Sequence, residues 1–198
     1  MMLCINDHIA DLDEQQTACL VASLPPWRRE EALRYKHIQG RRECAVGYIE
    51  LLRGLRLYFG IDGMPTFGYG RHGKPFLVGH PEVYFSISHC RVAAGCYVSD
   101  HPCGLDIERI RKAKPDLVRH AMNPQEAGDI FNSASPDIAF TRLWTQKEAV
   151  LKLKGTGLTD SLHHVLDHDD MEHIILKTTE NLYLGYIFTV ATSSRQSL

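Results

Sequence analysis

The sequence FSISHCRVAAGCYVSDHPCGLDIE, residues 85–108, predicts two apolar strands followed by a third strand that ends in acidic residues. Side chains at positions i and i+2 of a strand point to the same face of a sheet. Asp106 and Glu108 therefore share one face, while Leu105 and Ile107 point the other way, into a core. Two carboxylates on one face repel each other unless a positive charge lies between them, and the identity of that charge bears on function.

A hard divalent cation such as Mg²⁺ would supply that charge, because it takes oxygen ligands and tolerates neighbouring carboxylates. The alternative is two solvated acids at a strand end, since Asp-x-Glu is a short and common pattern. A third carboxylate favours the metal. In WTQKEAVLK, residues 144–152, the side chains of Trp144, Glu148 and Lys152 recur at i, i+4 and i+8 and so share one helix face.

The same helix face has two interpretations. It could be an exposed Glu–Lys pair with Trp144 as an anchor, which stabilises a helix only slightly. It could also present one acid and one base to a common pocket. Transfer of a phosphoryl-type group needs that combination, namely a metal ligand and a cation beside the phosphate oxygens.

Composition limits the possible classes of protein. The chain has 198 residues, enough for one domain or for two small lobes that share a core. Its formal net charge of −2 argues against a general nucleic-acid-binding protein. We expect neither a signal peptide nor a membrane span, because no basic segment precedes an apolar run and no apolar stretch approaches about twenty residues. The six cysteines form no Cys-x-x-Cys pair, which favours reduced thiols in a cytoplasmic protein.

Apolar residues at helical intervals predict helices in both halves of the chain. One helical segment covers residues 27–58, with a break expected at Gly40. The strongest pattern covers residues 137–153, and Gly155 supplies a stop signal. Two prolines stand where further helices could begin: Pro115 and Pro124.

Strand-like and loop segments complete the pattern. Residues 60–76 are rich in Gly and Pro and are interpreted as a loop. Near the C-terminus, strand-like runs cover residues 163–168, 173–178 and 183–192. Helices precede strands twice along the chain, so we expect two similar α+β lobes that meet near residue 104.

Four motifs in this order and spacing resemble the 4′-phosphopantetheinyl transferases. They are GKP (73–75), FSISHC (85–90), GLDIE (104–108) and WTQKEAVLK (144–152). In size the chain is most similar to the surfactin-synthetase-activating type. The resemblance implies an α+β fold of two pseudo-symmetric lobes, each a small antiparallel sheet packed on a long helix, with the active site at the lobe junction. The N-terminal lobe would cover residues 1–103 and the C-terminal lobe residues 104–198.

The resemblance implies a chemistry for the acidic residues. The family transfers the phosphopantetheine arm of coenzyme A to a serine of a carrier protein and releases 3′,5′-ADP. By motif, Asp106, Glu108 and Glu148 would bind Mg²⁺, with Mn²⁺ as a possible substitute, together with the pyrophosphate. Glu148 would also be the base for the serine hydroxyl, and Lys152 would stabilise charge on the leaving phosphate.

The resemblance also implies contacts to coenzyme A from the N-terminal half. Lys74, Ser88 and His89 fall within the family's motifs, and an imidazole N–H can donate to a phosphate oxygen. Among the N-terminal arginines, we favour Arg42 for the 3′-phosphate and place Arg28 second. Each of these residues could instead be a solvated or structurally satisfied side chain. Glu126 stands where the family carries another acid.

A basic segment follows the acidic strand directly. Its positive residues would steer an acidic acyl or peptidyl carrier protein to the adjacent site, and they are Arg109, Arg111, Lys112 and Lys114. Met122 and Phe131 could add apolar contacts. The alternative is a solvated basic loop. By family analogy a single chain with two lobes suggests a monomer.

Two other functions remain open at this point. A Mg²⁺-dependent phosphohydrolase acting on a nucleotide or on coenzyme A would use the same three acids. A non-catalytic module could bind coenzyme A or a carrier protein without transferring anything.

A histidine cluster could bind a transition metal, although its spacing is not that of a helical zinc motif. It comprises His163, His164, His168 and His173.

Overall fold

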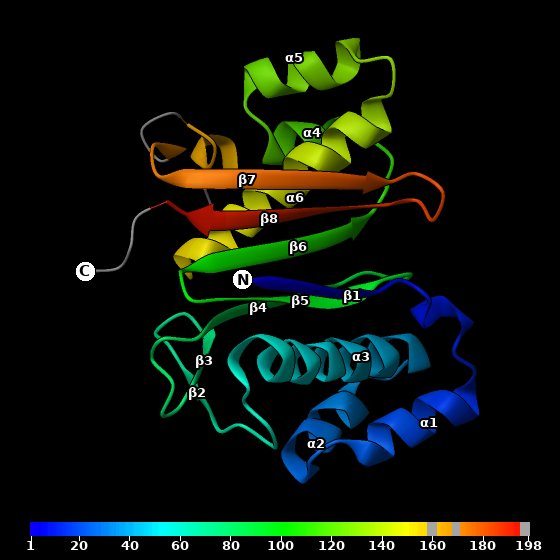
Figure 1. The fold of residues 1–198 in the computed structure, drawn as a ribbon. Coiled ribbons are helices and arrows are strands. Elements are labelled where there is room, and N and C mark those ends of the chain that lie inside the picture. The colour runs from blue at the N-terminus through cyan, green and yellow to red at the C-terminus, as the bar shows by residue number, and fades with distance from the viewer. Residues whose placement is uncertain (158–161, 168–170, 195–198) are drawn as a thin grey trace.

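The computed structural model describes residues 1–157, 162–167 and 171–194. It consists of two lobes, each built on a three-stranded antiparallel sheet, which confirms the expected fold class (Figure 1). The N-terminal sheet has the order β1-β5-β4, with bounds Met2–Asn6, Ala94–Ser99 and Tyr84–His89. The C-terminal sheet has the order β6-β8-β7, with bounds Cys103–Arg109, Tyr186–Ser193 and Ile174–Asn181.

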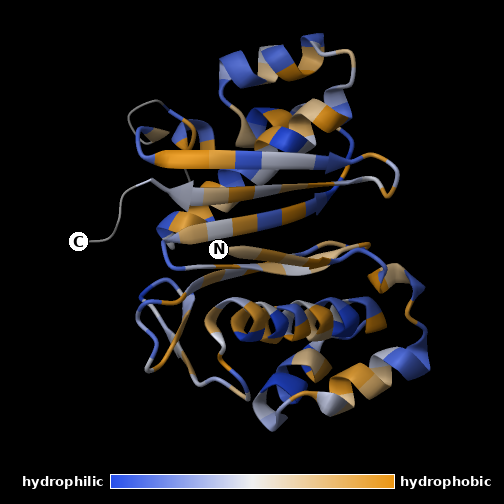
Figure 2. Ribbon diagram, in the orientation of Figure 1, coloured by the Kyte–Doolittle hydropathy of each residue, from blue (hydrophilic) through white to orange (hydrophobic). Residues whose placement is uncertain are grey.

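A long helix packs on each sheet. Figure 1 shows α3 (Ile38–Gly54) against the N-terminal sheet and α6 (Pro136–Lys154) behind the C-terminal sheet. Figure 2 shows apolar and polar residues alternating along β6, whereas both kinds form bands around α3. This difference is expected, because successive side chains of a strand point to opposite faces, whereas residues on one face of a helix recur every three or four positions. Helix α3 is covered on one side by the sheet and on the other by α1 (Glu14–Ser23) and α2 (Pro26–Arg34).

The break in the first helical segment lies earlier than expected. Helix α2 ends at Arg34 and α3 begins at Ile38, so Gly40 stands inside α3 rather than at its start. The structure gives this glycine another role. A Cβ atom at Gly40 would lie 2.5 Å from the ring of Tyr35, so the absence of a side chain lets the tyrosine pack there.

Two features of the N-terminal lobe were not predicted. Residues 2–6 form β1, which pairs with β5 across the sheet. The segment interpreted as a loop contains a short hairpin, β2 (Phe67–Tyr69) and β3 (Pro75–Leu77). Both features depend on tertiary pairing, and the glycines and prolines of the hairpin conceal its strands from a periodicity analysis.

The helices of the C-terminal lobe begin where the prolines indicate. Pro115 opens α4 (Pro115–Ala121) and Pro124 opens α5 (Pro124–Asn132), each at a position where the missing N–H has no helical partner. Helix α6 ends at Gly155, whose φ of 68° is the left-handed conformation that glycine adopts readily.

The three strand-like runs near the C-terminus have different outcomes. The last two are strands β7 and β8, joined by a turn that ends at Gly185. The run 163–168 was wrongly interpreted as a strand, because residues 162–164 form a 3₁₀ turn and no strand follows within 165–167. Across the described parts of the chain, no helix is long and apolar enough to cross a membrane.

The lobes meet along β4 and β6, which run side by side in the same direction. These strands belong to separate sheets, and serine hydroxyl groups bridge them. The N–H of Leu105 donates to Ser86 Oγ at 2.9 Å, and the N–H of Ile107 donates to Ser88 Oγ at 3.0 Å. At the start of β6, a Cβ at Gly104 would lie 2.0 Å from the carbonyl oxygen of Ala149, so glycine is required for this approach to α6.

Candidate active site

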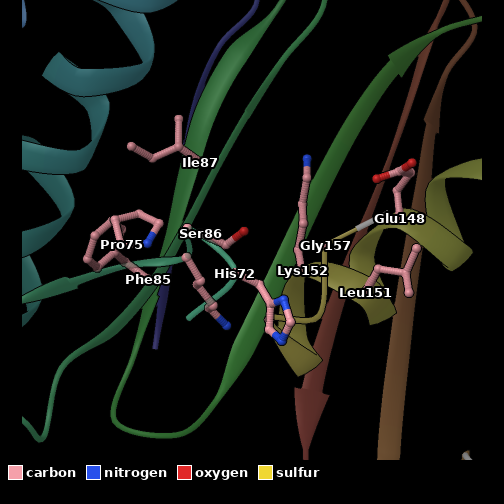
Figure 3. A pocket seen from close by; sticks show the side chains of 12 residues that line it. His72, Pro75, Phe85, Ser86, Ile87, Glu148, Leu151, Lys152 and Gly157 are labelled. Carbon is pink, nitrogen blue, oxygen red and sulfur yellow. The ribbon is translucent and has the colours of Figure 1, made fainter. Parts of the chain in front are cut away.

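A pocket of about 330 Å³ opens at the junction of the two lobes (Figure 3). The N-terminal lobe lines it with the β2–β3 turn and strand β4, through His72, Lys74, Pro75, Phe85 and Ile87. The C-terminal lobe lines it with α6 and the residues after it, through Glu148, Leu151, Lys152, Gly155 and Gly157. Figure 3 shows Glu148 and Lys152 on the helix side and Ser86 and Ile87 on the strand side. The volume suits part of a small-molecule ligand.

The i, i+4, i+8 face of α6 is turned toward β6. Lys152 Nζ lies 2.7 Å from Asp106 Oδ1, and Trp144 Nε1 donates to Glu108 Oε1 at 3.2 Å. Glu148 stands between them on the helix. The acidic end of β6 and the acid–base face of α6 therefore meet beside the junction pocket.

The two glutamates of this acidic group have raised pKa values. Burial and then the negative charge of Asp106 raise the pKa of Glu148 above its ordinary value, and Glu108 adds to this rise. Burial and then Asp106 also raise the pKa of Glu108, against the opposing effects of Arg111 and Lys152. Such mutual effects require the three acids to lie close enough to repel each other.

The donor set fits a divalent cation in kind, although the side chains are not arranged around one. Among the described residues, no three His, Cys, Asp or Glu side chains form a ready-made metal cluster. Asp106 is 4% exposed, and its Oδ2 is buried without a hydrogen-bond partner. A buried carboxylate oxygen with no donor, beside two further acids whose charged forms are disfavoured, is what a hard cation would satisfy.

Arg111 lies beside Glu108, at the end of the acidic group away from Lys152 and Asp106. Its guanidinium pairs with Glu108 Oε2 and lies over the ring of Trp144, 5.1 Å from the centroid. Its backbone N–H donates to Thr141 Oγ1 on α6 at 3.1 Å. Arg111 was expected on the surface with its basic neighbours, but its side chain turns inward instead, onto the acid that would bind the metal.

The other three basic residues of this segment are exposed. Arg109, Lys112 and Lys114 make no ion pair with any carboxylate in the described part of the chain. Phe131 is also exposed, at 44%. Met122 was expected to add an apolar surface contact, which is wrong, since it is 1% exposed and belongs to the core of the C-terminal lobe.

The residues of the FSISHC motif make contacts within the protein. The Ser88 hydroxyl donates to Asp106 Oδ1 at 3.1 Å and accepts from Lys152 Nζ at 2.9 Å. His89 is partly exposed, and its Nδ1 lies 3.2 Å from Glu43 Oε2. Burial pushes the pKa of Glu43 up, but hydrogen bonds from His89 and Gln39 outweigh it and hold that pKa below its ordinary value.

Lys74 joins the lobes at the edge of the pocket. Its Nζ donates to the carbonyl oxygens of Cys103 and Leu153, at 3.1 and 3.0 Å. Burial lowers the pKa of this lysine. Lys74 therefore ties the start of β6 to the last turn of α6, and it also lines the pocket.

The two favoured arginines lie in different surroundings. Arg28 lines a second cavity of about 230 Å³, which shares Pro75, Phe85 and Ile87 with the junction pocket. Arg42 is 8% exposed, and its guanidinium donates to Thr17 Oγ1 and to the carbonyl oxygen of Ala10. Arg42 thus ties α3 to α1 and the turn before it, which leaves Arg28 better placed for a ligand.

The structure assigns Glu126 a contact that the sequence did not indicate. Its Oε2 lies 2.6 Å from Nζ of Lys147, which is 2% exposed and also donates to the carbonyl oxygens of Ala121 and Leu162. Glu126 also accepts from the backbone N–H of Asn123 and so caps α5. The sequence did contain a signal for this contact. Lys147 lies on the opposite side of α6 from Lys152, and a lysine that faces the core needs a buried partner.

The described histidines of the cluster, His163, His164 and His173, each contact different partners and do not form one site. His163 Nε2 lies near the carbonyl oxygens of Arg119 and His120, and His164 Nδ1 lies 2.8 Å from Asp167 Oδ2. His173 lies near Glu172. The remaining member, His168, lies outside the described residues.

Comparisons with known proteins point to one family. The model of the "4'-phosphopantetheinyl transferase superfamily" matches residues 102–190. A 4′-phosphopantetheinyl transferase of Bacillus subtilis is 28% identical over 144 residues, which are 71% of this chain and 64% of that protein. The chain thus spans less than two thirds of that relative. The 4′-phosphopantetheinyl transferase AcpT of Escherichia coli (strain K12) is 30% identical over 169 residues, which are 78% of this chain and 82% of that protein.

Proposed function

The chain belongs to the 4′-phosphopantetheinyl transferase superfamily, and we propose that it transfers the 4′-phosphopantetheine arm of coenzyme A to a serine of an apo acyl or peptidyl carrier protein, releasing 3′,5′-ADP. The observation that carries the proposal is the meeting of Asp106, Glu108, Glu148 and Lys152 beside one pocket between the lobes. Three acids and a lysine suit a diphosphate substrate held through a metal ion.

The acids would hold the metal. Asp106, Glu108 and Glu148 supply an all-oxygen donor set suited to Mg²⁺, and to Mn²⁺ as a substitute. When bound, the ion would offset the negative charge of the pyrophosphate. In the structure, Lys152 pairs with Asp106 and Arg111 pairs with Glu108. Lys152 and Arg111 therefore neutralise these acids in the metal-free protein, and the metal ion would replace them as the positive charge.

Glu148 would accept the proton of the attacking serine. Burial and Asp106 raise its pKa in the metal-free protein, which makes the carboxylate a stronger base than an exposed glutamate, and coordination to the metal would offset this rise. Lys152, one turn further along α6, would then donate to the phosphate oxygens on which negative charge develops as 3′,5′-ADP departs. Both side chains line the same pocket, so they can act on one substrate.

Coenzyme A would lie in the junction pocket and in the second cavity beside it, which share lining residues. Lys74, which lines the junction pocket, and His89 would contact its phosphates, and Arg28 would bind the 3′-phosphate from the second cavity. Arg42 is the weaker candidate, because it lines neither of these two cavities, whereas Arg28, which pairs with Glu31, lines the second.

The carrier protein would dock beside β6. Arg109, Lys112 and Lys114 form an exposed basic surface directly after Glu108, suited to an acidic partner. Both lobes of one chain line the pocket, which supports activity as a monomer. All six cysteines are free, in keeping with a role in the reducing cytoplasm.

One assay tests the proposal. The protein is incubated with coenzyme A, Mg²⁺ and an apo carrier protein, and the carrier is then weighed by mass spectrometry. Transfer adds one phosphopantetheine to the carrier serine. EDTA should abolish the addition, and the Lys152→Ala variant should slow it strongly. Release of 3′,5′-ADP with an unchanged carrier would indicate a phosphohydrolase instead. Binding of coenzyme A with no product would indicate a non-catalytic module. A panel of apo carriers would identify the preferred partner.

A further inference from the structure

Two cysteines face each other across the N-terminal sheet. Cys4 in β1 and Cys96 in β5 are direct partners in the antiparallel register, so their side chains point to the same face of the sheet. Both lie in the core between the sheet and α3, beside Leu51, with exposed fractions of 5% and 0%. No other two cysteines are partners in the described strands. The proposed active site uses neither thiol.

The separation of these two residues suits a disulfide. Residues directly opposite each other in an antiparallel pair have Cα atoms about 4.5–5.5 Å apart, within the range of about 4.4–6.8 Å that disulfides span. Their Cβ atoms are typically about 4.5–5.5 Å apart, whereas a disulfide brings them to about 3.5–4.5 Å. A local shift of about 1 Å in the edge strand would therefore close the bond.

The two sulfur atoms already interact. The Cys96 S–H has two acceptors within reach, the carbonyl oxygen of Glu50 at 3.0 Å and the sulfur of Cys4. The hydrogen bond from Cys96 lowers the pKa of the Cys4 thiol to about 7, against burial and the charge of Glu50, which raise it. A substantial part of Cys4 is therefore thiolate at neutral pH, and the thiolate is the form that attacks a disulfide.

Cys4 lies where a small reagent can reach it after a limited opening of the fold. Strand β1 is at the edge of the sheet order β1-β5-β4, so it pairs with one strand, whereas β5 pairs with two. Openings of single elements occur in native proteins without global unfolding. Detachment of β1 would expose Cys4 and leave β5 paired with β4.

We propose that Cys4 and Cys96 are a reversible thiol–disulfide pair, which a small disulfide such as glutathione disulfide oxidises to a crosslink between β1 and β5. The Cys4 thiolate attacks one sulfur of the reagent, which forms a mixed disulfide and releases one glutathione thiolate. The Cys96 thiol gives its proton to that thiolate and attacks the Cys4 sulfur. The second glutathione then leaves and takes a proton from solvent. The two protein thiols lose two electrons, and the reagent is reduced to two thiols.

The bond would join residues that are far apart in the sequence. The closed segment, residues 4–96, contains α1, α2, α3 and the β2–β3 hairpin, and closing so long a segment lowers the entropy of the unfolded chain. Cys96 is also the strand partner of Ile87, which lines the junction pocket. The crosslink would therefore stabilise the sheet beside the pocket without occupying the pocket. This inference does not depend on the proposed function.

Oxidation of the folded protein tests the proposal. The protein carries Cys19→Ser throughout, because Cys19 is exposed and would react with the reagent on its own. It is equilibrated with glutathione disulfide and glutathione at rising ratios, and the remaining thiols are then alkylated. We expect a loss of two hydrogen atoms by mass, a Cys4–Cys96 bond in the peptide map, and a Tm that rises by several degrees. Dithiothreitol should reverse all three changes.

Two matched variants separate this pair from the other thiols. Cys96→Ala removes the resolving thiol, so Cys4 should keep glutathione as a mixed disulfide, and Tm should not rise. Cys44→Ala removes another buried cysteine of the same lobe and should form the crosslink as its parent does.

Three results would overturn the proposal. The first is the absence of a Cys4–Cys96 bond at the most oxidising ratio, the second is a bond between different cysteines, and the third is oxidation of this pair without a rise in Tm. The peptide map needs no substitution at Cys4 or Cys96, so it decides the proposal even if Cys96→Ala fails to fold.

Discussion

The ammonium group of Lys152, on α6, lies 2.7 Å from Oδ1 of Asp106, on β6, and the two residues form an ion pair beside the pocket. Lys152 is the more exposed partner, with 32% of its side chain accessible against 6% for Asp106. The lysine can therefore leave the pair toward the pocket, whereas the aspartate stays in place.

Replacing Lys152 should affect catalysis more than binding. We expect Lys152→Ala to lower kcat at least about a hundredfold, as the loss of a donor to developing charge does in other enzymes. Affinity for coenzyme A should change less. Transfer to an apo carrier, followed by mass spectrometry over time, measures the rate. Lys177→Ala, on the exposed side of β7, is the control. Equal rates in the two variants would exclude the proposed role.

Glu148 should destabilise the metal-free fold at neutral pH. Because its pKa is raised in the folded protein, its charged form is disfavoured there. That penalty is absent below about pH 4 and grows as pH rises from the ordinary carboxyl pKa through the raised one. Glu148→Gln should therefore raise Tm in EDTA at pH 7.5 and leave it unchanged near pH 4. The control is Glu172→Gln, at a side chain that is 70% exposed. A lower Tm at pH 7.5 would contradict the expectation.

Arg111 should compete with the metal for Glu108. Its guanidinium occupies Glu108 Oε2 and stacks on Trp144, so removing it frees an acid. We expect Arg111→Ala to bind Mn²⁺ several-fold more tightly than wild type when coenzyme A is present. Titration followed by Trp144 fluorescence, in a Trp27→Phe background, reports this directly. Lys112→Ala, one residue away and exposed, should leave Mn²⁺ affinity unchanged. Weaker Mn²⁺ binding in Arg111→Ala would show that Arg111 supports the site instead.

The buried pair of Lys147 and Glu126 should matter for stability. Glu126→Gln leaves a lysine that is 2% exposed without a counter-charge, and such a loss costs about 3–5 kcal/mol. Urea unfolding measures the change in free energy. The exposed pair of Arg119 and Asp116 provides the comparison, since Arg119→Ala should cost at most about 1 kcal/mol. Similar costs at both sites would mean that the buried pair is not strongly coupled.

Gly104 and Gly128 should respond to alanine in opposite directions. At Gly104 the added Cβ would meet the carbonyl oxygen of Ala149 at 2.0 Å, and we expect a loss of about 1–3 kcal/mol or more. At Gly128, inside α5, nothing lies within 4 Å of the added Cβ. Alanine there should stabilise the helix by up to about 1 kcal/mol. Unfolding midpoints in urea test both, and a neutral Gly104→Ala would mean that β6 can move away from α6.

The parts that local geometry determines could be predicted from the sequence. The period of two in β6 places Asp106 and Glu108 on one face, and the period of 3.6 in α6 places Glu148 and Lys152 on one face. Motif resemblance then indicated that these faces meet. Gly155 ends α6, as expected, because a left-handed cap suits glycine.

The features that were missed depend on contacts between distant segments. Strand β1 exists because it pairs with β5, and its sequence alone does not indicate the partner. The inward turn of Arg111 depends on Trp144 of α6, more than thirty residues away. Whether an arginine points to solvent or to a buried acid cannot be decided by spacing along the chain.

The serine bridges between β4 and β6 have a consequence for solubility. Each of these strands is the last in its own sheet, and an uncovered last strand can template pairing with other chains. Here the amides of Leu105 and Ile107 end on hydroxyl oxygens, and the two strands cover each other. Neither offers a continuous row of peptide groups to a neighbouring molecule. The junction that builds the pocket thus also removes two of the sheet edges at which another chain could pair.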